Sequence, residues 1–187
     1  MKYLDLHGRS VTTQSLLLND LLSDYQQLLG ADGDAYRNHC MRVFNFCIAF
    51  AGDNPEAEDK IVIATLFHDL GLWSDSTFDY IIPSQLLARR YLEQSGRSTW
   101  IDEIEAMIGE HHKITRYQMN PLWLVESFRK ADWVDISGGL LRFHLPDDYV
   151  SDVLDAFPNA GFHKKLGDLF VERLKTHPFN PLPMMKL

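Results

Sequence analysis

The hydrophobic residues of this chain recur at the spacing of α-helices along most of its length. Apolar positions three or four residues apart form one stripe in each segment, and the strict alternation or β-branched runs of strands are missing. Prolines and capping side chains precede the stripes and glycines follow them, which marks the helix ends. The pattern predicts an all-α fold, with helices at about 13–29, 34–51, 56–70, 83–96, 98–111, 120–138, 147–157 and 162–177.

The same pattern indicates one compact unit. No internal repeat, low-complexity tract or long linker divides the 187 residues. A chain of this length buries roughly 70% of the surface that its unfolded form exposes, which is enough for one core. We expect a single domain over residues 1–187, with a core at about 34–137, a helix before it and a helical extension after it. The proline-rich segment from Pro178 onward is expected to lie extended over the surface.

The charge balance argues against nucleic acids and membranes as partners. Asp and Glu outnumber Lys and Arg by 26 to 18, which gives a net charge of −8, and no basic run exceeds two residues. An acidic protein is repelled by phosphate backbones and anionic lipid surfaces. No apolar stretch approaches the roughly 18 residues of a membrane span, and the first residues do not resemble a signal peptide. We therefore expect a cytoplasmic protein.

The two cysteines agree with a reducing compartment. Cys40 and Cys47 lie in one predicted helix, seven residues apart. Their Cα atoms are then roughly 10 Å apart, whereas a disulfide requires less than about 7 Å. We expect both thiols to be buried and unpaired.

Four ionisable residues fall on or beside the apolar stripes of three predicted helices: His39, His68, Asp69 and Asp132. Their burial costs several kcal/mol unless charges or hydrogen bonds compensate it. One divalent metal ion would compensate it, because its charge stabilises carboxylates and neutral imidazoles ligate it well. Such mixed nitrogen and oxygen ligation suits Mn, Fe, Co, Ni or Zn and disfavours Ca. We keep Mg as a further candidate for the one divalent ion.

Periodicity alone leaves the acid in the helix at 120–138 open. Asp132 and Asp135 each share an apolar stripe with Phe128, so both are candidates for the interior.

The order of the motifs resembles a known family. His39 in YRNHCMRV, His68-Asp69 in ATLFHDLG and Asp132 in FRKADWVD resemble the HD superfamily of metal-dependent phosphohydrolases, over about residues 34–137. The resemblance implies a compact all-α bundle and gives these four residues the role of metal ligands. It favours Asp132 over Asp135, because the family motif aligns with the acid that follows alanine.

One departure from the family favours a single ion. Dinuclear members need two further, well separated histidines between the HD dipeptide and the last Asp. Here that interval holds only His111 and His112, which are adjacent. The diiron branch has His-Glu at the start of the helix after HD, where this chain has Ser84-Gln85.

The residues near the proposed ligands suggest catalytic and binding roles. Asp69 is expected to orient the attacking water or to accept its proton. His111 or His112 is expected to hydrogen-bond the metal-bound water or the substrate anion. Three basic residues, Lys113, Arg116 and Lys130, are close in sequence and are expected to contact that anion.

These features together predict a metal-dependent hydrolase. We expect a phosphohydrolase that acts on a small phosphorylated or anionic metabolite or nucleotide through a metal-bound hydroxide. The same scaffold also hosts hydratases and iron oxygenases, and fold does not fix function. A third alternative is a non-catalytic domain that binds a metabolite or a regulatory partner and keeps the metal for stability.

Overall fold

The computed structural model describes residues 10–52, 54 and 56–186. These residues form ten α-helices and two short 3-10 helices, with a single isolated β-bridge between Lys113 and Lys186. The predicted all-α fold is confirmed. The helices are α1 (Leu16–Asp24), α2 (Gln26–Leu29), α3 (Gly33–Ala51), α4 (Ala57–Phe67), α5 (Gly71–Ser74), α6 (Ile81–Gln94), α7 (Ile101–Glu110), α8 (Val125–Ile136), α9 (Asp147–Ala156) and α10 (Phe162–Thr176), with 3-10 turns η1 (Gly30–Asp32) and η2 (Ser98–Trp100).

Three predicted helices were too long. The segment at 13–29 divides into α1 and α2 at Tyr25, and the segment at 120–138 becomes helical only at Val125. The segment at 56–70 ends as α4 at Phe67, and the chain turns before α5. Apolar spacing continues through these turns because their side chains are still buried, so periodicity alone does not show where the backbone bends.

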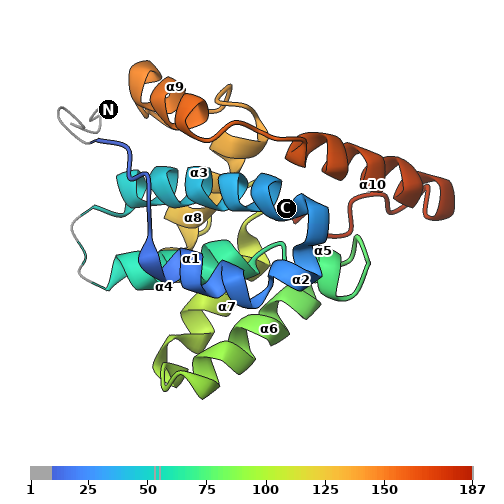
Figure 1. Cartoon of the computed structure of the whole chain (residues 1–187), viewed down its shortest axis with the longest axis horizontal. Helices are drawn as coiled ribbons and strands as arrows, with labels where there is room; N and C mark the ends of the chain where they lie inside the picture. Colours follow the sequence, from blue (N-terminus) through green and yellow to red (C-terminus); the bar gives the residue numbers. More distant parts are fainter. Residues whose placement is uncertain (1–9, 53, 55, 187) are drawn as a thin grey trace.

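Helix α3 lies at the centre of the molecule. It packs most extensively against α8 and next against α4. Figure 1 shows α3 running across the molecule, with α1, α2 and α4 on one side of it and α9 and α10 on the other. Its side chains are buried on several faces, Cys40 and Cys47 among them, and both thiols are free as expected. A helix that is covered all round presents its polar residues to the interior.

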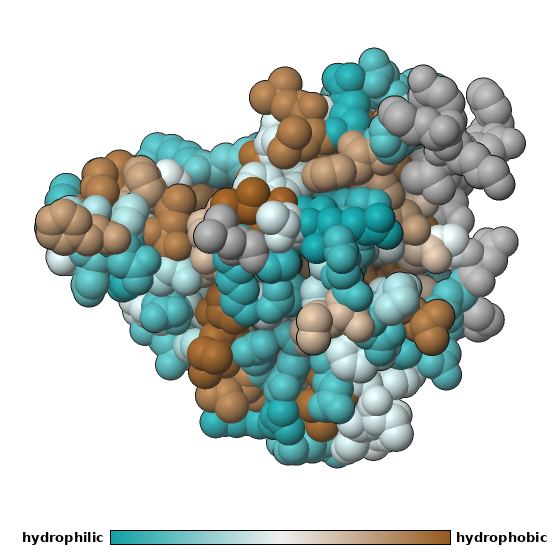
Figure 2. Space-filling view, turned by 180° about the vertical axis from the view of Figure 1, so that it is seen from behind, coloured by the Kyte–Doolittle hydropathy of each residue, from teal (hydrophilic) through white to brown (hydrophobic). Residues whose placement is uncertain are grey.

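The C-terminal part forms an arm that returns to the bundle. Helix α10 projects beyond the other helices in Figure 1, and Figure 2 shows hydrophobic and hydrophilic side chains mixed over this arm. The chain then turns back, and the Ile114 N–H donates to the Lys186 carbonyl at 2.8 Å. Met184 is only 5% exposed, so the expectation of a tail lying over the surface is wrong at this residue. A small apolar cluster around Tyr80, Phe78 and Met184 holds the segment in place.

No helix among the described residues combines the length and the apolar character that crossing a membrane requires.

The turn after α4 is fixed by a close approach of two backbones. The Gly71 N–H donates to Ser84 Oγ at 3.0 Å, which joins the start of α5 to α6. A Cβ added at Gly71 would overlap the Tyr80 carbonyl oxygen and lie 2.9 Å from Ser84 Oγ. Only glycine permits this contact, which sets the direction of the chain just after His68 and Asp69.

We therefore expect Gly71→Ala to lower the free energy of unfolding by about 2 kcal/mol, since backbone and not a flexible side chain must move. The matched control is Gly33→Ala, because Gly33 has right-handed helical angles and open space around its missing Cβ. That variant should be neutral or up to ~1 kcal/mol more stable. Urea unfolding measures both, and equal effects at the two sites would contradict the account.

Candidate metal centre

Four side chains from distant parts of the chain meet in the interior. His39 comes from α3, His68 and Asp69 from the turn after α4, and Asp132 from α8. His39 Nε2 and His68 Nε2 are 2.9 Å apart, and Asp69 Oδ2 lies 3.6 and 3.5 Å from them. Asp132 Oδ1 lies 4.0 and 3.7 Å from the same two nitrogens. All four side chains are at most 2% exposed. The structure thus brings together the four residues predicted as ligands.

The hydrogen bonds assign the protons on the two imidazoles. His68 Nδ1 lies 2.7 Å from the Thr65 carbonyl oxygen, which only accepts, so Nδ1 carries a proton. His39 Nδ1 lies 2.6 Å from Asp135 Oδ2, and it donates to that carboxylate. One of the two facing Nε2 atoms must also donate. If His68 is neutral, the donor is His39 Nε2–H, and His39 is an imidazolium.

The pKa values agree with this assignment. Burial lowers the pKa of His68 to about 3, so that ring is neutral. Burial also lowers the pKa of His39, but the hydrogen bond to Asp135 and the nearby Asp69 outweigh it and raise the pKa to about 9. In this state a proton on His39 supplies positive charge between the acids, and a metal ion would replace it.

The two acids of the cluster differ in pKa. Burial opposes ionisation of Asp69, but the neighbouring histidines outweigh it and hold its pKa well below the usual range. For Asp132, burial prevails and raises the pKa to about 7. Two buried carboxylates that share the same two histidine neighbours require a cation nearby before both can ionise.

Several polar atoms in the cluster have no hydrogen-bond partner within the part of the chain that the structure describes. They are Asp69 Oδ1, His111 Nε2 and both carboxylate oxygens of Asp132. Each such atom costs about 1–3 kcal/mol when it is buried and unsatisfied. Because three of these four atoms are carboxylate oxygens, a divalent cation fits them chemically.

Both candidate catalytic histidines face the cluster. His111 Nε2 is 3.5 Å from Asp69 Oδ1, and His112 Nδ1 is 3.5 Å from Asp132 Oδ2. They follow the end of α7 and present different ring nitrogens, which lets two adjacent residues point to one place. Their catalytic role stays a prediction.

The ligand atoms form two groups that share Asp69. One comprises His39, His68 and Asp69, the other Asp69, His111 and His112, and in each the ligand atoms lie within 4.8 Å of one another. One ion was predicted because His111 and His112 are adjacent in the sequence. In the structure both rings nevertheless face the cluster, so the number of ions stays a prediction.

Two neighbouring residues hold His39 in place. Asp135 accepts from His39 Nδ1–H and also pairs with Arg42, whose Nη2 lies 3.0 Å from its Oδ2. The guanidinium further donates to the Phe157 carbonyl at 2.9 Å. Burial opposes ionisation of Asp135, but His39 and Arg42 outweigh it and lower its pKa to about 2. Both acids that periodicity left open face the interior: Asp132 faces the cluster, and Asp135 orients the His39 ring through its Nδ1.

Tyr80 was not found from the sequence. Its hydroxyl lies 2.6 Å from His112 Nε2 and its side chain is buried. No sequence motif marks this contact, since residues 80 and 112 come together only through the packing of α6 on α7.

Lys130 and Lys113, two of the three predicted anion-binding residues, contact residues outside the ligand cluster. The Lys130 ammonium is 3.9 Å from Glu126 Oε1 and 5.4 Å from the Phe50 ring centre. Arg116 is exposed. The carbonyl of Lys113 accepts from Trp133 Nε1–H at 3.2 Å. Contact of these three residues with a substrate stays a prediction.

We expect the metal-free protein to lose stability as pH rises from about 6.5 to about 9. His39 keeps its proton up to about pH 9 when folded but only to about 6.5 when unfolded. The folded state therefore binds more protons in this window, and raising the pH favours unfolding. Urea midpoints in a chelating buffer measure the effect, and a midpoint that rises across the window would contradict the protonation assignment.

We expect one divalent ion per chain. Elemental analysis after metal loading and dialysis measures it, with His111→Ala as the diagnostic variant. This variant removes a ring outside the first ligand group, so it should keep the single ion. Two ions per chain, of which His111→Ala loses one, would show that the second group is also a metal site.

Comparison with known proteins identifies the family of this chain. A family model, that of the HD domain, matches residues 36–136. No curated protein and no solved structure matches the chain. The matched segment runs from α3 to the last residue of α8 and contains His39, His68, Asp69 and Asp132, together with His111 and His112. Because this match covers more than half of the chain, the protein belongs to the HD domain family.

Proposed function

We propose that the protein is a metal-dependent phosphohydrolase that acts on a small phosphorylated molecule. The observation that carries this proposal is a set of unsatisfied buried oxygens, Asp69 Oδ1 and both oxygens of Asp132, on carboxylates that lie within 4.0 Å of the His39 and His68 Nε2 atoms. Membership of the HD domain family, which is generally one of metal-dependent phosphohydrolases, supports the reaction class.

His39, His68, Asp69 and Asp132 would hold one divalent ion. When bound, such an ion lowers the pKa of water and neutralises charge on phosphoryl oxygens. Asp135 and Arg42 keep the His39 ring oriented, and the Thr65 carbonyl does the same for His68.

Other groups of the cluster contact the attacking water and the phosphoryl group. Asp69 is ionised, and its Oδ1 has no hydrogen-bond partner among the described residues, so we assign this oxygen the role of orienting the attacking water. Burial lowers the pKa of His111, but Asp69 and Asp132 outweigh it and raise that pKa. His111 Nε2–H then donates to a phosphoryl oxygen. Tyr80 fixes the ring of His112 through its Nε2.

The reaction is tested with phosphomonoesters, phosphodiesters and nucleotides, each in the presence of Mn, Co, Ni, Mg or Fe. We expect turnover of at least one compound, with kcat/KM reduced by roughly 100-fold or more in Asp69→Asn, because the substitution removes a carboxylate that would both ligate the ion and orient the attacking water. The matched control is Asp79→Asn, which makes the same change at an exposed acid between α5 and α6 and should leave kcat/KM unchanged.

Three results would overturn the proposal. Oxygen-dependent turnover with iron would identify an oxygenase, and hydration without phosphate release would identify a hydratase. Metal binding with no turnover in the wild type would leave a non-catalytic domain.

A further inference from the structure

A cavity of about 390 Å³ lies beside the ligand cluster. Its polar edge is formed by Tyr80, His112 and His163. His112 belongs to both places, since its Nδ1 lies 3.5 Å from Asp132 Oδ2. His163 Nε2 is buried without a hydrogen-bond partner in the described residues, and lies 3.9 Å from Asp135 Oδ2. The cavity therefore adjoins the proposed metal centre, with His112 between them.

The rest of the cavity wall is apolar. Trp133 and Ile136 line it from α8, Leu166 and Phe170 from α10, and Met184 from the C-terminal segment. None of the described residues that line it is a lysine or an arginine. A sugar hydroxyl or a second phosphate in this wall would lose its hydrogen bonds to water without replacement, at about 1–3 kcal/mol for each group. An apolar group would instead gain about 25 cal/mol for each Å² removed from water.

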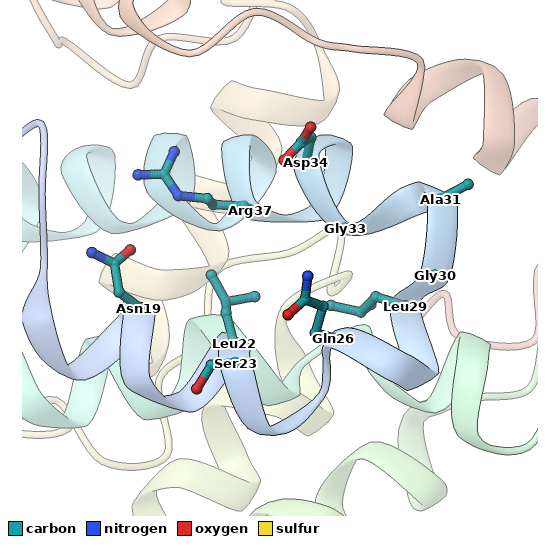
Figure 3. Close-up of a pocket in the computed structure, with 10 residues that line it drawn as sticks. All are labelled: Asn19, Leu22, Ser23, Gln26, Leu29, Gly30, Ala31, Gly33, Asp34 and Arg37. Carbon is teal, nitrogen blue, oxygen red and sulfur yellow. The ribbon is translucent and has the colours of Figure 1, made fainter.

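A second hollow, of about 460 Å³, has different surroundings. It lies between α1, α2 and the start of α3 and is lined by residues 19–37 (Figure 3). No residue of the cluster lines it, whereas His112 lines the first cavity, so a substrate bound in the second hollow would not reach the cluster.

We infer that the substrate is a phosphate ester with a compact apolar group, and that this group binds in the cavity between α8, α10 and the C-terminal segment. The inference rests on the proposed function, because the phosphoryl group is placed at the metal centre. The volume is at the lower end of the range of ligand sites, about 300–1,000 Å³, so it suits a single ring or a short branched chain. Leu166, Phe170 and Met184 select for that group.

Gly167 offers a direct way to fill the cavity. It lines the cavity from α10, and a Cβ added there meets no atom within 4 Å. Its backbone is right-handed and helical, so a leucine introduces no strain and raises helix propensity. Gly167→Leu should therefore fold as well as the wild type, and its thermal midpoint should be equal or higher.

The test uses two phosphonates that differ in the size of the apolar group and are not hydrolysed. Calorimetry measures the binding of benzylphosphonate and methylphosphonate to the metal-loaded protein. We expect the wild type to bind benzylphosphonate at least about 10-fold more tightly than methylphosphonate. This is less than the full free energy of burying a ring, because binding also costs conformational freedom. Gly167→Leu should abolish this preference and leave the Kd of methylphosphonate within about 2-fold. The matched control is Glu172→Leu, on α10 but outside the cavity lining, where the side chain is 69% exposed.

Equal binding of the two phosphonates by the wild type would overturn the inference, as would a preference that survives in Gly167→Leu or is lost in Glu172→Leu. Absence of binding for both would overturn it too. Failure of the proposed function gives a different result, because it removes turnover of esters by the wild type and not the preference for benzylphosphonate. A preference that depends on Gly167 supports the cavity even then.

Discussion

The burial of acids and imidazoles at the meeting point of α3, α4 and α8 is the constraint on which the rest of the structure depends. Asp69 and Asp132 lie within 4.0 Å of the same two histidine nitrogens and are almost fully covered. Two carboxylates in a dry interior cannot both ionise without a cation nearby. In the metal-free protein the proton on His39 supplies part of the required positive charge. The nearby acids stabilise this proton and therefore raise the pKa of His39.

The surrounding helices hold this charge in position. Asp135 links His39 on α3 to Arg42 one turn later, and Arg42 reaches the carbonyl of Phe157 after α9. The glycine-dependent turn after His68 and Asp69 sets the direction of α5, and α6 and α7 then bring Tyr80 to His112. The same arrangement leaves an apolar cavity next to the cluster, lined in part by α10 and the C-terminal segment. The charged ligand cluster and the apolar cavity beside it thus follow from the same packing of helices.

Much of this could be predicted from the sequence, because two of the four candidate ligands, His39 and Asp132, lie on strongly periodic helices. His39 and Asp132 occupy helix positions whose facing is set by neighbouring apolar residues, and the family resemblance supplied the pairing with His68 and Asp69. The turn after α4 escaped prediction, since burial continues through it. Asp135 was left as an alternative ligand because periodicity shows that a side chain faces inward but not which atom it touches. The cavity was beyond reach, since Tyr80, Trp133, Phe170 and Met184 become neighbours only in three dimensions.

Anomalous diffraction from crystals grown with Mn²⁺ tests the central claim most directly. The account predicts an anomalous peak at about 2.0–2.3 Å from His39 Nε2, His68 Nε2 and an oxygen of each of Asp69 and Asp132. It also predicts that His39 keeps its hydrogen bond to Asp135 while its Nε2 turns from His68 to the ion. Well-ordered crystals in which manganese binds only elsewhere, with the four side chains still in contact, would contradict it.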